Sequence, residues 1–194
     1  SEGLDDQFHP TYTRMVPAHH IMEVALVGCP DPNPRLERFF SPHRDALPAD
    51  IDEIGRRYVG TTADAITRWL RSIPASAPIG VCFSGGVDSG AVFLLTYHLH
   101  LSLGLNPSRL KAFTLSAGTD GEDLDDARRF LDALGLGLFL EPIELQPDDL
   151  AYERAVSLIE DYKPLDVQAA AMMDALCRGV RRRYPDWTYL IDGD

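Results

Sequence analysis

The stretch Val81-Cys82-Phe83-Ser84-Gly85-Gly86-Val87-Asp88-Ser89, VCFSGGVDS, decides how the rest of the chain is interpreted. An apolar run ends at a serine, two glycines follow, and a carboxylate and a second hydroxyl stand where a helix is expected to begin. Glycines let the chain turn tightly and bring its N–H groups close to a ligand. A helix N-terminus adds free donors and the positive end of a dipole. The stretch therefore predicts an anion-binding turn between a buried strand and a helix.

Asp88 needs a separate explanation, because a carboxylate repels phosphate unless a divalent cation lies between them. Mg²⁺ binds through carboxylates and phosphate oxygens and supplies such a bridge. A purely structural alternative makes Asp88 the N-cap of the helix and Ser89 a first-turn residue. That alternative does not explain the whole pattern SGGxDS, whose chance occurrence in a chain of this length is on the order of 10⁻⁴. We therefore expect a nucleotide phosphate site with Mg²⁺.

Strands and helices alternate along most of the chain. We expect strands at 79–83, 110–115, 138–145 and 187–191, and helices at 50–73, 89–103, 123–134, 147–162 and 166–184. This alternation predicts an α/β fold, a mainly parallel twisted sheet with helices on both faces. Ligands of such sheets bind at the carboxyl ends of the strands, which is where the turn after Phe83 would lie.

Residues 1–49 form a proline-rich, irregular lead-in, and residues 50–194 carry the alternating pattern. One strand-like run stands at 20–27, and prolines at 30, 32 and 34 predict a loop over 28–34. Adjacent histidines on a strand point to opposite faces, so His19 and His20 are expected in surface or packing roles. His98 and His100 lack the i, i+4 spacing of a metal pair and are also expected to be structural.

Composition and charge exclude several classes of function. The formal net charge of -12 argues against nucleic acid as a partner, and the basic cluster at Arg178 and 181–183 is expected in the last turns of a helix. No apolar run reaches the length of a membrane helix and the N-terminus does not resemble a signal peptide, so we expect a cytoplasmic protein without a membrane partner. Three widely spaced cysteines predict neither a disulfide framework nor a CxxC site.

A Walker-type phosphate loop carries a lysine, and none stands near this turn. SGGVDS instead resembles the pyrophosphate-binding loop (PP-loop) of the N-type ATP pyrophosphatases, which have an adenine nucleotide α-hydrolase-like fold. These enzymes cleave ATP between the α- and β-phosphates, form an adenylate and release pyrophosphate. They include asparagine synthetase, β-lactam synthetase, GMP synthetase, NAD synthetase, argininosuccinate synthetase and tRNA-thiolating enzymes.

Other segments resemble the asparagine synthetase and β-lactam synthetase branch. Residues 16–20 and 38–42 are similar to the join between its glutaminase and synthetase domains. The following segments occur in the family's order and at similar spacing: KAFTLSAG at 111–118, Asp125-Asp126-Ala127, Ile159-Glu160-Asp161-Tyr162, and Tyr189-Leu190-Ile191-Asp192-Gly193-Asp194. The third segment, with the Ala/Met-rich helix after it, resembles the region that lines the family's amino-acid pocket.

The resemblance implies roles for individual residues. Cys82 and Leu115 would flank the adenine of ATP, mainly through backbone groups, although Leu115 also fits as an ordinary buried strand residue. The loop residues Ser84, Gly85, Gly86, Val87, Asp88 and Ser89 would hold pyrophosphate and Mg²⁺, with Asp88 as the metal ligand. Gly193 would border the α-phosphate, and Asp194 would act near the reacting intermediate as a catalytic residue.

Three departures from the family pattern modify these expectations. Residue 1 is Ser, where a complete glutaminase half begins with a nucleophilic Cys, so ammonia is expected from a glutaminase partner or another amine source. The sequence stops inside the second Gly-rich motif, so a C-terminal segment or a second chain is expected to complete the site. Residues 164–168 lack the Thr/Arg-rich pattern of an aspartate pocket, which counts against aspartate as the carboxylate substrate.

The resemblance implies an asparagine synthetase-like ligase that adenylates a carboxylate and passes the acyl group to ammonia or an amine. Two alternatives stay open: an enzyme that adenylates a nucleobase or tRNA carbonyl, and a nucleotide-binding protein without catalytic activity. The acidic balance and the absence of CxxC pairs count against the first alternative. The second alternative predicts ATP binding without turnover, so analysis of the products formed from ATP distinguishes it from an enzyme.

Overall fold

The computed structural model describes residues 16–24, 35–43, 46–116, 122–145 and 149–193. The chain divides into two compact units, residues 1–54 and residues 55–194. The expected loop at 28–34 and the catalytic candidate Asp194 lie outside the described residues.

The first unit contains a two-stranded antiparallel sheet of β1 (His20–Glu23) and β2 (Arg35–Arg38). Sequence analysis missed β2, because Arg35-Leu36-Glu37-Arg38 has only one apolar residue and all four positions are exposed. His19 precedes β1 in a left-handed conformation with φ 63°, and only His20 belongs to the strand. The expectation that the two histidines lie on one strand is wrong. The ring of His19 lies edge-on to Phe40, with the ring centroids 5.0 Å apart.

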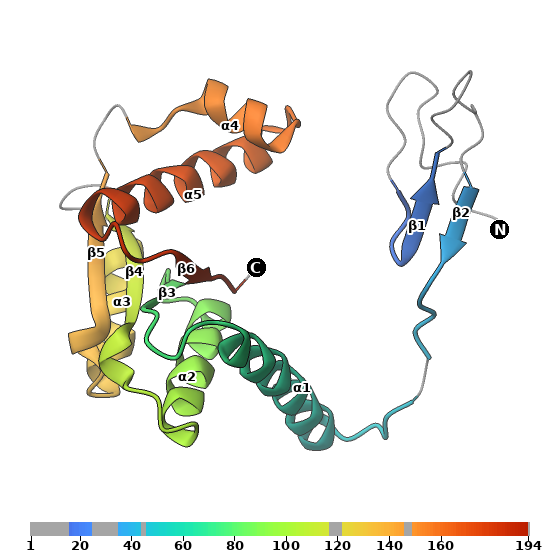
Figure 1. The fold of residues 1–194 in the computed structure, drawn as a ribbon, viewed down its shortest axis with the longest axis horizontal. Coiled ribbons are helices and arrows are strands. Elements are labelled where there is room, and N and C mark those ends of the chain that lie inside the picture. The colour runs from blue at the N-terminus through green and yellow to red at the C-terminus, as the bar shows by residue number, and fades with distance from the viewer. Residues whose placement is uncertain (1–15, 25–34, 44–45, 117–121, 146–148, 194) are drawn as a thin grey trace. The chain divides into compact units, whose positions relative to one another are not determined.

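The second unit is built on a four-stranded parallel sheet, which confirms the predicted α/β fold (Figure 1). Its strands are β3 (Ile79–Cys82), β4 (Leu110–Ser116), β5 (Leu140–Glu144) and β6 (Tyr189–Ile191), in the spatial order β5-β4-β3-β6. The chain proceeds outward from β3 to β4 and β5 and then returns to β6 on the other side of β3. The strand order therefore reverses at β3, and such switch points are where open α/β sheets form ligand crevices.

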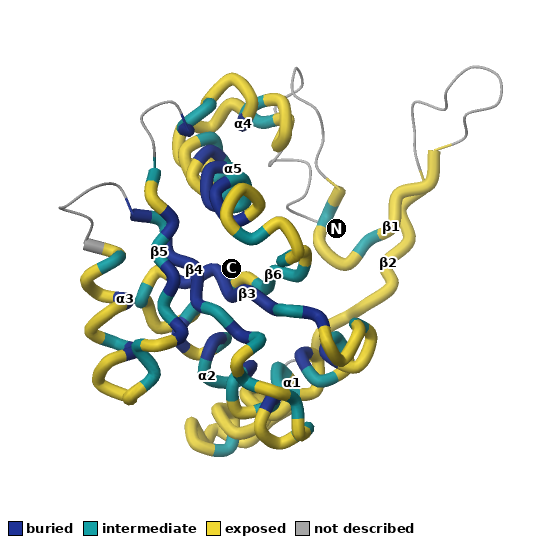
Figure 2. The backbone as a smooth tube through the Cα atoms, turned by 60° about the vertical axis from the view of Figure 1, so that its left-hand side comes forward, coloured by how far each residue is buried: buried dark blue, intermediate teal, exposed yellow. Residues whose placement is uncertain are grey.

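Helices cover both faces of this sheet (Figure 1). They are α1 (Ile51–Ser72), α2 (Val87–Ser102), α3 (Glu122–Ala133), α4 (Tyr152–Ile159) and α5 (Pro164–Arg183). Alternate residues of β3 point to opposite faces: Val81 packs in the core formed with α1, α2 and α3, whereas Cys82 packs in the core formed with α5. Both cores lie along the central strands β3 and β4, most of whose residues are buried (Figure 2).

Several predicted elements differ from the structure at their ends. Helix α2 begins at Val87, two residues before the predicted start, and α4 covers only part of the predicted helix at 147–162. The predicted strand at 138–145 begins as a 3₁₀ turn, Gly137–Phe139, and becomes β5 only at Leu140. In α1 the apolar side chains Ile51, Ile54 and Tyr58 are exposed, and burial is confined to its second half at Ile66 and Leu70.

The basic cluster lies at the end of α5, as predicted, with Arg181, Arg182 and Arg183 in its last turn and Arg178 one turn earlier. Its arginines are bound by the protein itself: Arg182 holds the buried Asp149 through two contacts of 2.8 and 3.0 Å, and Arg183 Nη2 lies 2.8 Å from Glu141 Oε1. Lys111 Nζ contacts the other oxygen of Glu141 at 2.9 Å. The Arg183 pair attaches the end of α5 to β5, the Arg182 pair attaches it to the segment before α4, and the Lys111 pair links β4 to β5. Within the described ranges, no helix combines the length and the apolar character needed to cross a membrane.

Candidate active site

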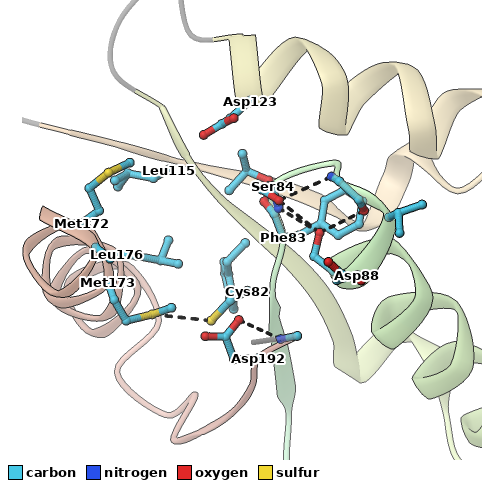
Figure 3. Close-up of a pocket in the computed structure, with 17 residues that line it drawn as sticks. Cys82, Phe83, Ser84, Asp88, Leu115, Asp123, Met172, Met173, Leu176 and Asp192 are labelled. Carbon is cyan, nitrogen blue, oxygen red and sulfur yellow. Dashed lines mark hydrogen bonds between the residues drawn. The ribbon is translucent and has the colours of Figure 1, made fainter. Parts of the chain in front are cut away.

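A cavity of about 280 Å³ opens at the carboxyl end of β3, at the switch point of the sheet (Figure 3). One end is polar and is formed by the turn after β3 and the start of α2. The other end is apolar and is formed by β3, β4 and α5. The lining residues are Cys82, Phe83, Ser84, Gly86, Val87, Asp88, Ser89, Phe113, Thr114, Leu115, Asp123, Ala169, Met172, Met173, Leu176, Asp192 and Gly193.

Two serine hydroxyls hold the turn in shape. Ser89 Oγ accepts a hydrogen bond from Ser84 N at 3.3 Å and donates one to Gly86 O at 3.3 Å. Ser84 Oγ accepts from Gly86 N at 3.4 Å and lies 3.2 Å from Ser89 Oγ. Thr114 Oγ1 also donates to Phe83 O at 2.7 Å, which ties the start of the turn to β4. The turn is therefore shaped by its own side chains before any ligand binds.

Helix α2 directs free backbone donors into the polar end. Its N-cap is Gly86, which provides no side-chain cap, and the first intrahelical bond shown is from Gly90 N to Gly86 O at 2.9 Å. The N–H groups of Val87, Asp88 and Ser89 consequently have no acceptor within the helix. The structural alternative for Asp88 is wrong, because Asp88 is not the N-cap but an exposed residue of the first turn. An exposed carboxylate beside free N–H donors is available to a cation that accompanies a phosphate.

Gly85 and Gly193 allow two close approaches of backbone around the turn. Gly85 has φ +81°, and a Cβ built on it would overlap the backbone nitrogen of Ala127 in α3. Gly85 thus faces α3 and allows the turn to pack directly against the backbone of that helix. A Cβ on Gly193 would lie 3.1 Å from Ser89 N and 3.2 Å from the carbonyl carbon of Asp88, so the chain after β6 closely approaches the start of α2.

The apolar end is lined by the last residues of two strands and by one face of α5. Cys82 ends β3 and is buried, and its Sγ lies 3.9 Å from Met173 Sδ. Leu115 is half-buried on β4, and Met172 and Leu176 complete the wall from α5 (Figure 3). An apolar lining of this kind suits an aromatic base. Cys177 lies nearby on α5, and burial, followed by the charges of Asp174 and Asp192, raises the pKa of its thiol.

The structure brings together nearly all residues that sequence analysis assigned to nucleotide binding. Cys82, Ser84, Gly86, Val87, Asp88, Ser89, Leu115 and Gly193 all line the cavity. Sequence analysis missed Asp123, at the start of α3, and Asp192, although both carboxylates also line it. It also missed Met172 and Met173, whose only signal was the Ala/Met-rich composition of the helix after Tyr162.

The chain is similar in fold to two solved structures. One is an NH3-dependent NAD synthetase from Campylobacter jejuni subsp. jejuni, with 16% sequence identity, a TM-score of 0.48, and coverage of 72% of this chain and 56% of that chain. The other is NMN synthetase from Francisella tularensis, with 20% identity, a TM-score of 0.44, and coverage of 72% and 54%. The chain thus spans little more than half the length of either protein. No curated protein sequence matches it.

A match to a protein-family model decides the relationship. The asparagine synthase family model matches residues 62–186, which include β3, the serine-glycine turn and the whole of α5. The matched range covers more than half of the chain. The cavity at the switch point, with its free N–H donors and its exposed Asp88, lies largely inside that range. The chain belongs to the asparagine synthase family, whose synthetase domain is a PP-loop ATP pyrophosphatase.

Proposed function

We propose that this chain provides the ATP site of a ligase that adenylates a small carboxylate, releases pyrophosphate, and transfers the acyl group to ammonia or an amine. The observation that carries the proposal is the two-ended cavity at the switch point of the sheet. Its apolar end suits an adenine base, and its polar end offers free N–H groups and hydroxyls to phosphates. Membership of the asparagine synthase family supports the same chemistry.

Pyrophosphate would bind at the polar end. The N–H groups of Val87, Asp88 and Ser89 point from the first turn of α2, and the helix dipole adds to their attraction for an anion. The Ser84 and Ser89 hydroxyls can exchange their mutual contact for contacts with phosphate oxygens. Because the turn is already held by hydrogen bonds within the protein, little reorganisation accompanies the departure of pyrophosphate.

The residues present fit Mg²⁺ bound together with ATP. No group of three or more His, Cys, Asp or Glu side chains in the described ranges could hold a metal by itself. Mg²⁺, however, usually keeps several waters and binds through one or two carboxylates and the phosphates of its substrate. Asp88, exposed at the polar end of the cavity, can supply such a carboxylate. When bound there, the ion would neutralise charge on the β- and γ-phosphates.

The proposed reaction has two steps. An oxygen of the substrate carboxylate attacks the α-phosphorus of ATP, a new P–O bond forms, and the bond to the β-phosphate breaks with release of pyrophosphate. The nitrogen of ammonia or an amine then attacks the acyl carbon, loses a proton, and displaces AMP. Gly193, whose backbone approaches Ser89 N, would border the α-phosphate. Its missing side chain lets the chain after β6 pack closely against the start of α2.

The test is to incubate the protein with ATP, Mg²⁺, ammonium and a panel of small carboxylates, and to separate AMP from ADP. We expect AMP and pyrophosphate in equal amounts, dependent on one class of carboxylate. ADP as the product, or ATP binding without any AMP, would contradict the proposal. A tRNA or nucleobase requirement for AMP formation would replace the carboxylate with another acceptor.

Asp88→Asn tests the metal ligand in the same assay. The change removes a charge without removing volume, and we expect ATP binding to lose most of its Mg²⁺ dependence and AMP formation to fall about 100-fold or more. Asp64→Asn is the matched control, because Asp64 is exposed on α1 and does not line the cavity. Equal effects of the two substitutions would show that Asp88 acts only through the net charge of the protein.

A further inference from the structure

Asp192 lines the cavity in the segment after β6, which runs from the level of Cys82 toward the start of α2. In the sheet, Ile191 of β6 pairs with Val81 of β3, so Asp192 follows β6 at the level of Cys82, which belongs to the apolar end. The next residue, Gly193, closely approaches Ser89 N at the polar end. Residue 192 therefore stands where the chain passes from the base end to the phosphate end.

The carboxylate of Asp192 is held in place but retains capacity to bind. Its Oδ1 accepts a hydrogen bond from Gly193 N at 2.8 Å, which restrains the side chain (Figure 3). In the part of the chain that the structure describes, no other hydrogen bond or ion pair to this carboxylate is found. The side chain is exposed and lines the cavity. An ionised carboxylate only accepts hydrogen bonds, so a ligand group that binds to it must be a donor.

The order of groups in a nucleotide identifies that donor. With the base at the apolar end and the phosphates at the N-terminus of α2, the ribose lies between them, and its hydroxyls are the nearest donors. We propose that Asp192 accepts a hydrogen bond from a ribose hydroxyl and thereby selects ribonucleotides over deoxyribonucleotides. This inference rests on the proposed ATP site. A carboxylate is a suitable acceptor, because dinucleotide-binding folds use Asp or Glu to bind ribose hydroxyls.

The experiment compares the binding of ATP, 2′-deoxy-ATP and 3′-deoxy-ATP to the full chain by calorimetry. We expect the unmodified protein to bind at least one deoxy analogue about tenfold more weakly than ATP, the loss typical of a hydrogen bond to a charged group. Asp192→Ala should weaken ATP binding by a similar factor and leave binding of that analogue unchanged. Asp192→Asn keeps an acceptor for Gly193 N, and its affinity for ATP should lie between those of the unmodified protein and Asp192→Ala.

Asp123→Asn is the charge-matched control, because Asp123 lines the same cavity from the start of α3. We expect it to leave the ratio of ATP to deoxy-ATP affinity unchanged. Equal weakening of all three nucleotides by Asp192→Ala, or a change only in Mg²⁺ dependence, would overturn the ribose assignment. If the unmodified protein binds no ATP, the proposed function itself fails, whereas ATP binding with unaltered discrimination in Asp192→Ala overturns the ribose contact alone.

Discussion

At the scale of single residues, Gly85 meets two requirements that together only glycine can satisfy. Its φ of +81° lies in the left-handed region, and the direction a Cβ would take is filled by the backbone of Asp126 and Ala127 in α3. Gly104 has a similar φ of +66°, but nothing lies within 4 Å of the position that its Cβ would take. The two glycines therefore separate the cost of backbone strain from the cost of a steric clash.

We expect Gly104→Ala to lower the free energy of unfolding by about 1–2 kcal/mol, the cost of a left-handed conformation. Gly85→Ala should lower it by roughly a further 1–3 kcal/mol, because α3 must move away from the turn. Urea unfolding of both variants measures the difference. Equal losses would mean that α3 adapts to the new side chain, and the close approach at Gly85 would then not be required.

At the scale of elements, the packing of α5 on the sheet depends on a small residue. Gly179 lies in the interior of α5, where a Cβ would overlap Cγ2 of the buried Ile143 in β5. Gly60 is also inside a helix, α1, but nothing lies within 4 Å of its Cβ position. Glycine lowers helix stability in both places, yet only Gly179 allows a helix to approach a strand closely.

The same substitution should therefore have opposite effects at these two positions. We expect Gly60→Ala to raise the free energy of unfolding by about 0.5–1 kcal/mol through better helix propensity. Gly179→Ala should lower it by about 1–3 kcal/mol, because Ile143 is β-branched and cannot rotate away. Thermal and urea unfolding give both values. A stabilised Gly179→Ala variant would contradict the close packing of α5 against β5.

At the scale of the whole molecule, two buried groups couple stability to pH. Burial lowers the pKa of His100 below its usual 6.5, a backbone hydrogen bond to Thr96 opposes this, and the charge of Arg109 lowers the pKa further. Burial alone would raise the pKa of Glu141, but hydrogen bonds from Lys111 and Tyr184 and the charges of Lys111 and Arg183 outweigh it, so its pKa is lowered from 4.5. In both cases, as the pH falls, the group is protonated at a higher pH in the unfolded chain than in the folded one.

The free energy of unfolding should therefore fall as the solution is acidified. The loss from His100 begins as the pH drops through 6.5, and the loss from Glu141 begins as it drops through 4.5. Urea unfolding across this range tests the sign. His100→Gln should flatten the profile between about pH 6.5 and 5, whereas His98→Gln, at an exposed position, should not. Parallel profiles for His100→Gln and the unmodified protein would exclude a role for His100.

The sequence by itself determined the alternating strands and helices and the turn from Ser84 to Ser89, because these depend on periodicity and on residues that are neighbours in the chain. Most of the cavity's nucleotide-binding candidates come from that local stretch. Only the tertiary structure decided that Asp192 and the methionines of α5 join them. These residues lie about a hundred positions further along, and the return of β6 to the side of β3 brings Asp192 to Cys82. Such a return depends on burial of the whole sheet between two helical layers, which no local pattern encodes.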